Sequence, residues 1–266
     1  MPGIPILGPI QSVYFWMKNR KRARIMKSWA DENGLQFVPD AKDFKSPGNP
    51  HASEDASHIG KHSAKAHGIF SRMMGRSKIQ SEFPQFASNR FRGDWQKDKN
   101  ICWGSCKGYT VVVWDTIFYD LHDDNGNMDW TEGEYTSIMV LCDIPIHRTM
   151  VTPNTLLKRL SAFGIEEGRG AFGMSTVNFE LDQFNKAYRV KAADERWTFA
   201  IIDQAMMEWL IEQKKHTIEM APGGVTVSTW FTLDSQQIDE QLGFITGLLD
   251  RIPEDLKRPV VSQGSS

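Results

Sequence analysis

Two strand-forming segments on either side of a Lys107-Gly108 dipeptide constrain the fold more than any other feature of this sequence. Residues 101–106 precede the dipeptide, and residues 109–118, with the β-branched run 110–113, follow it. β-branched residues favour extended backbone, and a two-residue connection ending in glycine joins antiparallel neighbours. The sequence therefore predicts a β-hairpin in which Cys106 ends one strand and Tyr109 begins the next.

The rest of the C-terminal half predicts further strands and helices. The expected strands are 135–143, 148–151, 176–181, 187–191, 217–221 and 225–231. The expected helices are 154–163, a long helix capped by Asp194 that carries Trp197 to Leu210, and a helix capped by Asp234 and ended by Pro253. This order lacks regular βαβ alternation. We expect an α+β fold of antiparallel β-hairpins with three packed helices.

The apolar residues of the last two expected helices recur every three or four positions, which predicts that the two helices share one core. The residues expected in that core are Trp197, Ile201, Leu210, Leu242, Ile245 and Leu249.

Changes in composition predict four segments. Residues 1–39 form an apolar and basic segment, with a basic helix from about Gln11 to Asn33, and residues 40–95 form a low-order linker rich in Ser, Gly and Asn. Residues 96–256 form the α+β body, and residues 257–266 a disordered tail. A linker couples its neighbours weakly, so removal of residues 1–24 should leave the body folded.

The net charge of −2 conceals a strong asymmetry. Residues 1–99 hold 17 Lys and Arg against 9 Asp and Glu, or +8, which leaves 14 against 24, or −10, for residues 100–266. Such asymmetry indicates that the basic half meets an anionic surface. Nucleic acid is not the expected partner, because the acidic body would repel phosphates.

The basic residues follow a cluster of aromatic ones, and together they predict a membrane contact. The residues concerned are Tyr14, Phe15, Trp16, Lys18, Arg20, Lys21, Arg22 and Arg24. Tyr and Trp favour the headgroup layer, and each basic residue near an anionic leaflet contributes about 1 kcal/mol. The alternative is a helix that packs its apolar end on the body and leaves its charges in solvent.

The apolar run at residues 4–17 does not predict a spanning helix or a signal peptide. It is shorter than the roughly 20 residues needed to cross a bilayer, and its positive charges follow rather than precede it. The three cysteines form no disulfide framework, which favours a reducing compartment. We expect a cytoplasmic protein that is peripheral at the inner membrane face.

Residues 104–108, Gly-Ser-Cys-Lys-Gly, have the spacing of a nucleophile elbow with Cys106 as nucleophile and His147 and Asp115 as partners. An elbow must open a helix, whereas the residues that follow are strand-like. A hairpin turn is therefore the better interpretation.

Two further motifs contain metal-binding residue types. The loop Asp123–Glu132 matches much of a calcium loop, but the first ligand position would be Leu121 and the flanks are strands. A solvated acidic hairpin loop is the better interpretation. His51, His58, His62 and His67 have no recognised tetrahedral spacing, and they indicate a His-rich polar linker.

Four segments of the second half resemble an uncharacterised family of bacterial proteins, over roughly residues 95–255. They are residues 184–190, 193–196, 206–210 and 248–253. Members of that family commonly carry a membrane-spanning segment ahead of the shared domain. The resemblance implies membrane association and assigns no activity, ligand or catalytic residue.

Together these observations predict a non-enzymatic interaction or scaffold domain at the cytoplasmic face of the membrane. Its expected partners are an anionic membrane surface or another protein, and no cofactor is expected. The alternative is an enzyme or metal-binding protein whose site is assembled from Cys106, His147 and Asp115, or from the Asp123–Glu132 loop.

Overall fold

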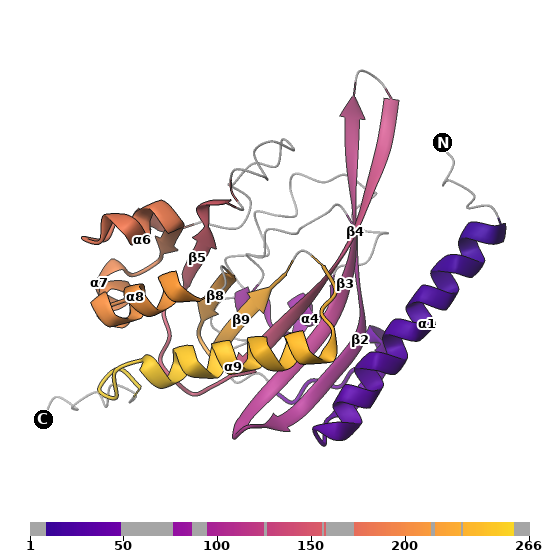
Figure 1. Ribbon diagram of the computed structural model, residues 1–266, viewed down its shortest axis with the longest axis horizontal. Helices are drawn as coiled ribbons and strands as arrows, with labels where there is room; N and C mark the ends of the chain where they lie inside the picture. Colours follow the sequence, from indigo (N-terminus) through magenta and orange to yellow (C-terminus); the bar gives the residue numbers. More distant parts are fainter. Residues whose placement is uncertain are drawn as a thin grey trace, which may run out of the picture.

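The computed structural model describes residues 9–48, 77–86, 95–124, 127–155, 157, 173–213, 216–229 and 231–257 (Figure 1). These residues form a nine-stranded sheet in the order β1-β2-β3-β4-β9-β8-β5-β7-β6, in which all neighbours are antiparallel. The α+β class is therefore confirmed.

The strands are β1 Gln36–Asp40, β2 Trp95–Cys106, β3 Tyr109–Asp124, β4 Asn127–Leu141, β5 Thr149–Pro153, β6 Ser175–Val177, β7 Tyr188–Ala192, β8 Thr217–Ala221 and β9 Gly224–Ser228. The helices are α1 Pro9–Glu32, α4 Lys78–Glu82, α6 Asp182–Ala187, α7 Glu195–Ile201, α8 Gln204–Glu212 and α9 Ser235–Arg251, with the 3-10 turns η1 Ala41–Asp43 and η2 Pro84–Phe86.

The hairpin predicted around Lys107-Gly108 is confirmed. Cys106 pairs with Tyr109, and both turn residues have positive φ, 51° at Lys107 and 82° at Gly108. Positive φ at both central positions is the conformation of a type I′ turn, whose twist matches that of antiparallel strands. Cys106 therefore opens no helix, and the nucleophile-elbow geometry is absent.

The solvated acidic loop expected between the predicted strands 109–118 and 135–143 is wrong, because most of the residues between them extend the β3–β4 hairpin. The two strands pair continuously as far as Asp124 and Asn127. Aspartate disfavours strands, but ladder hydrogen bonds and cross-strand contacts override that preference. At the base of the extension, the ring of Phe118 occupies the space that a side chain at Gly133 would need.

The sheet separates two apolar clusters. The larger one lies on the face covered by α1, α8 and α9, and includes Met26, Trp29, Val113, Ile138 and Leu242. Alternation along the strands sends the next residues to the other face, where a smaller cluster collects. Its members include Phe44, Phe83, Trp103, Val112 and Met139.

The N-terminal segment is part of this body, so the boundary expected near residue 39 is wrong. Strand β1 pairs with β2, and Trp29 on α1 is 1% exposed in the larger core. The linker expected at residues 40–95 is also wrong for its described parts, since residues 41–48 and 77–86 supply Phe44, Ile79 and Phe83 to the second face. The four histidines of the predicted His-rich linker lie outside the described residues.

The helical region differs from the expected three packed helices. The long helix expected after Asp194 ends at Ile201, because Asp203 accepts a hydrogen bond from the backbone N–H of Met206 and begins α8. Residues 182–185, expected between two strands, lie in α6. The helix expected at 154–163 lies largely outside the described residues.

Other predictions for this region are confirmed. Asp194 and Asp234 both cap helices, and Asp234 forms a capping box with Gln237. The six predicted core residues all belong to the larger cluster, with Trp197 partly buried at its edge.

Candidate functional site at the junction of helix α1 and the sheet

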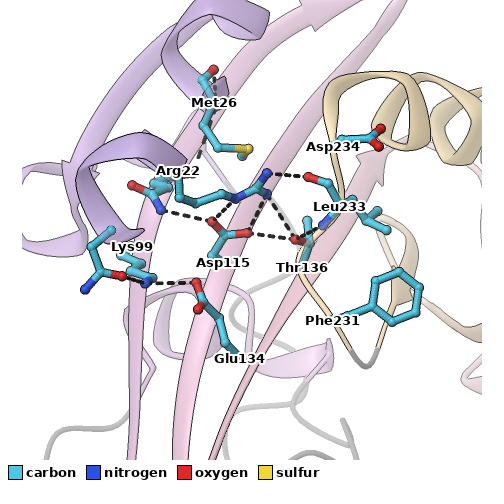
Figure 2. A network of polar contacts seen from close by, with 12 residues as sticks. Arg22, Met26, Lys99, Asp115, Glu134, Thr136, Phe231, Leu233 and Asp234 are labelled. Carbon is cyan, nitrogen blue, oxygen red and sulfur yellow. Dashed lines mark hydrogen bonds and ion pairs between the residues drawn. The ribbon is translucent and has the colours of Figure 1, made fainter. Parts of the chain in front are cut away.

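A buried ion pair joins α1 to the centre of the sheet. The Nε and Nη2 atoms of Arg22 donate to the two carboxylate oxygens of Asp115 on β3, each at 2.9 Å (Figure 2). Arg22 is 8% exposed and Asp115 is fully buried. A bidentate arginine–carboxylate pair fixes both side chains in one plane, so the pair sets the rotation of α1 about its axis.

The same pair connects β4 and the segment that leads into α9. The Thr136 hydroxyl lies 2.7 Å from a carboxylate oxygen of Asp115 and accepts the backbone N–H of Leu233 at 3.0 Å. The Arg22 guanidinium also donates to the carbonyl of Leu233, and the Asn100 amide donates to Asp115 at 2.9 Å. Five parts of the chain, α1, β2, β3, β4 and the segment before α9, thus meet at one polar cluster. We call it the Arg22 cluster: Arg22, Asn100, Asp115, Thr136 and Leu233.

A second set of charges lies beside the Arg22 cluster, toward the N-terminal end of α1. The Lys99 ammonium lies 2.9 Å from Glu134 and donates to the Asn19 side-chain oxygen at 2.7 Å. Lys18 lies 3.6 Å from the same glutamate. These contacts fix α1 against β2 and β4 as far as Lys18.

The predicted membrane-contact residues separate into two groups. Lys18, Arg20, Lys21 and Arg24 are exposed. Arg22 is the exception, and its prediction as a headgroup contact is wrong because its charge is neutralised by Asp115 inside the protein. The backbone of Tyr14, Phe15 and Trp16 is part of α1, and the structure does not describe their side chains.

The alternative catalytic set is not assembled. The Cys106 sulfur lies 3.9 Å from the Asn33 side-chain oxygen, whereas His147 lies 3.8 Å from the Asp194 carboxylate. Asp115 is held by Arg22, six residues along β3 from the partner of Cys106, a separation of roughly 20 Å. Burial also raises the pKa of the Cys106 thiol, which disfavours the nucleophilic thiolate.

The structure gives no ligand geometry for the calcium-loop alternative at Asp123–Glu132. Residues 125–126 and the side chains of the surrounding loop lie outside the description. Elsewhere in the described chain, no three His, Cys, Asp or Glu side chains are grouped so that they could hold a metal ion. Within the described ranges, no helix combines the length and apolar character that a membrane crossing requires.

A second buried carboxylate, which the sequence did not reveal, lies on the other face of the sheet. Asp98 accepts hydrogen bonds from the Ser77 hydroxyl at 2.6 Å, the Ile79 N–H at 2.9 Å and the Thr116 hydroxyl at 3.0 Å. It therefore holds the start of α4 on the sheet. Burial raises the pKa of Asp98, although its hydrogen bonds oppose that shift.

One sequence signal could have revealed the Arg22 cluster. Asp115 follows three valines and a tryptophan in a strand, where an unpaired carboxylate is costly, so a cation or hydrogen-bond donors inside the protein are expected beside it. The sequence does not show whether the partner is a cation, nor which of the 31 Lys and Arg residues it would be.

Comparison with known proteins assigns no family. No protein-family model matches the chain, and no curated protein matches it. Among solved structures, the chain is similar to the crystal structure of the mycobacterial trehalose monomycolate transport factor A, with a TM-score of 0.49 and 14% sequence identity over 90% of this chain and 99% of that one. A likeness at this level assigns neither a family nor a function.

Proposed function

We propose that this chain is a non-enzymatic interaction or scaffold protein, held peripherally at the cytoplasmic face of a membrane by the N-terminal end of α1. The observation that carries the proposal is the contrast between the two ends of this helix. Its C-terminal half is fixed by Arg22, Met26 and Trp29, whereas its N-terminal end extends away from the sheet (Figure 1).

The outward side of α1 supports this proposal. Arg22 points to the interior, and residues three or four positions apart share a helix face. By this spacing the side opposite Arg22 carries Met17, Arg20, Lys21 and Arg24. All four are exposed, and Met17 is 60% exposed although it is a large apolar residue.

The same spacing continues toward the N-terminus with apolar residues. Ile10, Val13 and Tyr14 precede Met17 at intervals of three and four, so one side of the helix changes along its length from apolar to basic. An apolar stripe that enters the interfacial layer, followed by cations at the headgroup level, is the pattern of an interfacial helix.

The cysteines support a location in a reducing compartment. Cys102, Cys106 and Cys142 are all free thiols. Disulfides form where the surroundings are oxidising, so free thiols are consistent with the cytoplasmic side of a membrane.

Co-sedimentation of the full chain with lipid vesicles tests the proposal. We expect binding to vesicles of phosphatidylcholine and phosphatidylserine, and release as salt screens the charges. The triple variant Arg20→Gln, Lys21→Gln, Arg24→Gln should bind about a hundredfold more weakly at low salt, because each cation contributes about 1 kcal/mol.

A matched variant controls for net charge. Lys42, Lys45 and Lys186 are exposed and lie outside α1, and their replacement by Gln removes the same three charges. This control should bind as the wild type does. Equal loss in the two triple variants, or equal wild-type binding to pure phosphatidylcholine vesicles, would show that α1 is not an anionic-surface anchor.

A further inference from the structure

The β3–β4 hairpin extends beyond the described residues of the strands on both of its sides (Figure 1). Strand β2 begins at Trp95, opposite Tyr119, and β9 ends at Ser228, opposite Ser137. The two strands nevertheless pair with each other as far as Asp124 and Asn127. A two-stranded ribbon with no third strand is marginally stable in water.

Among the described residues, none pairs with the outer edge of β4 from Asn127 to Glu134. The chain after β9 follows β4 only as far as Thr136, whose N–H donates to the Phe231 carbonyl and whose carbonyl accepts the Thr229 N–H. Alternate residues of a strand point their backbone groups the same way. Met128, Trp130, Glu132 and Glu134 therefore direct their N–H and C=O groups to the same edge as Thr136.

This edge lacks two of the usual devices against strand addition, proline and lysine, so its charge is acidic alone. Natural edge strands use proline or lysine to prevent pairing with another chain, and residues 117–136 contain no proline, lysine or arginine. They do contain six acidic residues, and Glu134 among them lies against Lys18 and Lys99. The acidic residues are Asp120, Asp123, Asp124, Asp129, Glu132 and Glu134.

The charge of the edge selects its partner. Antiparallel pairing of β4 with β4 of a second copy would bring acidic residues close to acidic residues, which destabilises the pair. A strand with Lys or Arg at alternate positions would instead place cations next to Glu132 and Glu134, the two acidic positions of β4 that share one face of the strand. We propose that the β4 edge, Asn127–Glu134, binds an extended, basic segment of a partner protein by antiparallel strand addition. This surface lies on a different element from the outward side of α1, and the proposal does not rest on membrane binding.

A synthetic ten-residue peptide that alternates Lys with Val or Thr is the probe, and fluorescence anisotropy measures its binding to the full chain. We expect saturable one-to-one binding. The same peptide with Glu in place of Lys should not bind. A peptide with the Lys residues retained but every backbone nitrogen methylated should also fail, because it cannot donate to the β4 carbonyls. Equal affinity of the methylated and unmethylated peptides would overturn the proposal.

Substitutions at Glu132 locate the site. Glu132→Pro removes an N–H at the open edge and leaves the ladder to β3 intact, whereas Glu132→Thr removes the same charge and keeps the N–H. We expect the proline variant to bind about tenfold more weakly than the threonine variant, with unchanged hairpin pairing by NMR. Equal affinities would show that the peptide does not add to β4. Concentration-dependent dimerisation abolished by the proline variant would identify a second copy as the occupant and would also overturn the proposal.

Discussion

Both carboxylate oxygens of Asp115 lie 2.9 Å from nitrogens of Arg22, although the two residues are 93 positions apart. This pair is the point at which the basic N-terminal helix becomes part of the acidic body. Because the same arginine also contacts the carbonyl of Leu233, a change at this position reaches α1, the sheet and the start of α9 together.

Replacement of Arg22 by Met should destabilise the protein by about 3–5 kcal/mol, because it leaves the Asp115 carboxylate buried without its counter-charge. Urea denaturation followed by tryptophan fluorescence measures the loss. The double variant Arg22→Met, Asp115→Asn should lose at least about 1 kcal/mol less than the sum of the single variants, since the two residues are directly coupled.

Arg24→Met is the matched control for this experiment. Arg24 lies on the same helix but is exposed, so its replacement should change the free energy of unfolding by no more than about 0.5 kcal/mol. Equal losses in the two single variants would show that the buried pair contributes nothing specific.

Local sequence patterns predicted the elements but not how they meet. The Lys107-Gly108 turn and the Asp234 cap depend on a few neighbouring residues, and both were predicted. The Arg22–Asp115 pair depends on contact across 93 residues, and a basic run beside aromatic residues looks the same whether it is solvated or buried. The acidic β3–β4 extension was missed because strand pairing overrode the local preferences of its aspartates.

Asp98 should make the stability depend on pH in the direction opposite to most carboxylates. Its pKa is raised by burial above the ordinary 3.8, so its stabilising contribution is present in full below the unfolded pKa and is lost as pH rises through the folded one. The free energy of unfolding of the wild type relative to Asp98→Asn should therefore fall as pH rises through this range. A pH series of denaturation curves measures it, and a difference that rises with pH would contradict it.

The three thiols should react slowly in the native protein. Burial raises the pKa of Cys102, Cys106 and Cys142, and Cys102 also lies 3.6 Å from the Met26 carbonyl. Iodoacetamide labelling followed by mass spectrometry should modify partly buried Cys142 first, and Cys102 only after unfolding. Rapid labelling of Cys106 at neutral pH would instead indicate an activated nucleophile and revive the enzymatic alternative.

Lys107→Asn should stabilise the hairpin. Lys107 has φ of 51°, in the left-handed region that costs a side-chain-bearing residue about 1–2 kcal/mol and that asparagine tolerates better. The variant has the Asn-Gly sequence preferred in type I′ turns, so we expect a gain of up to about 1 kcal/mol in thermal or urea denaturation. Lys42→Asn, at an exposed position outside any hairpin turn, should give no such gain.

Two N-terminal deletions distinguish anchoring from folding. Removal of residues 1–24 takes away Arg22 and leaves Asp115 buried without its ion-pair partner. The body should therefore not fold as stably without this segment, contrary to the sequence-based expectation. We expect the free energy of unfolding to drop by about 3–5 kcal/mol. Removal of residues 1–16 keeps Lys18, Asn19, Arg22 and Met26 with their contacts. That shorter deletion should unfold at nearly the wild-type urea concentration, because α1 retains its attachment to the sheet. If the apolar end of α1 enters the membrane interface, the same variant should bind anionic vesicles more weakly while it remains folded. A shorter deletion that destabilises the protein as much as the longer one would show that residues 9–16 pack on the body, and the proposed anchor would have to be abandoned.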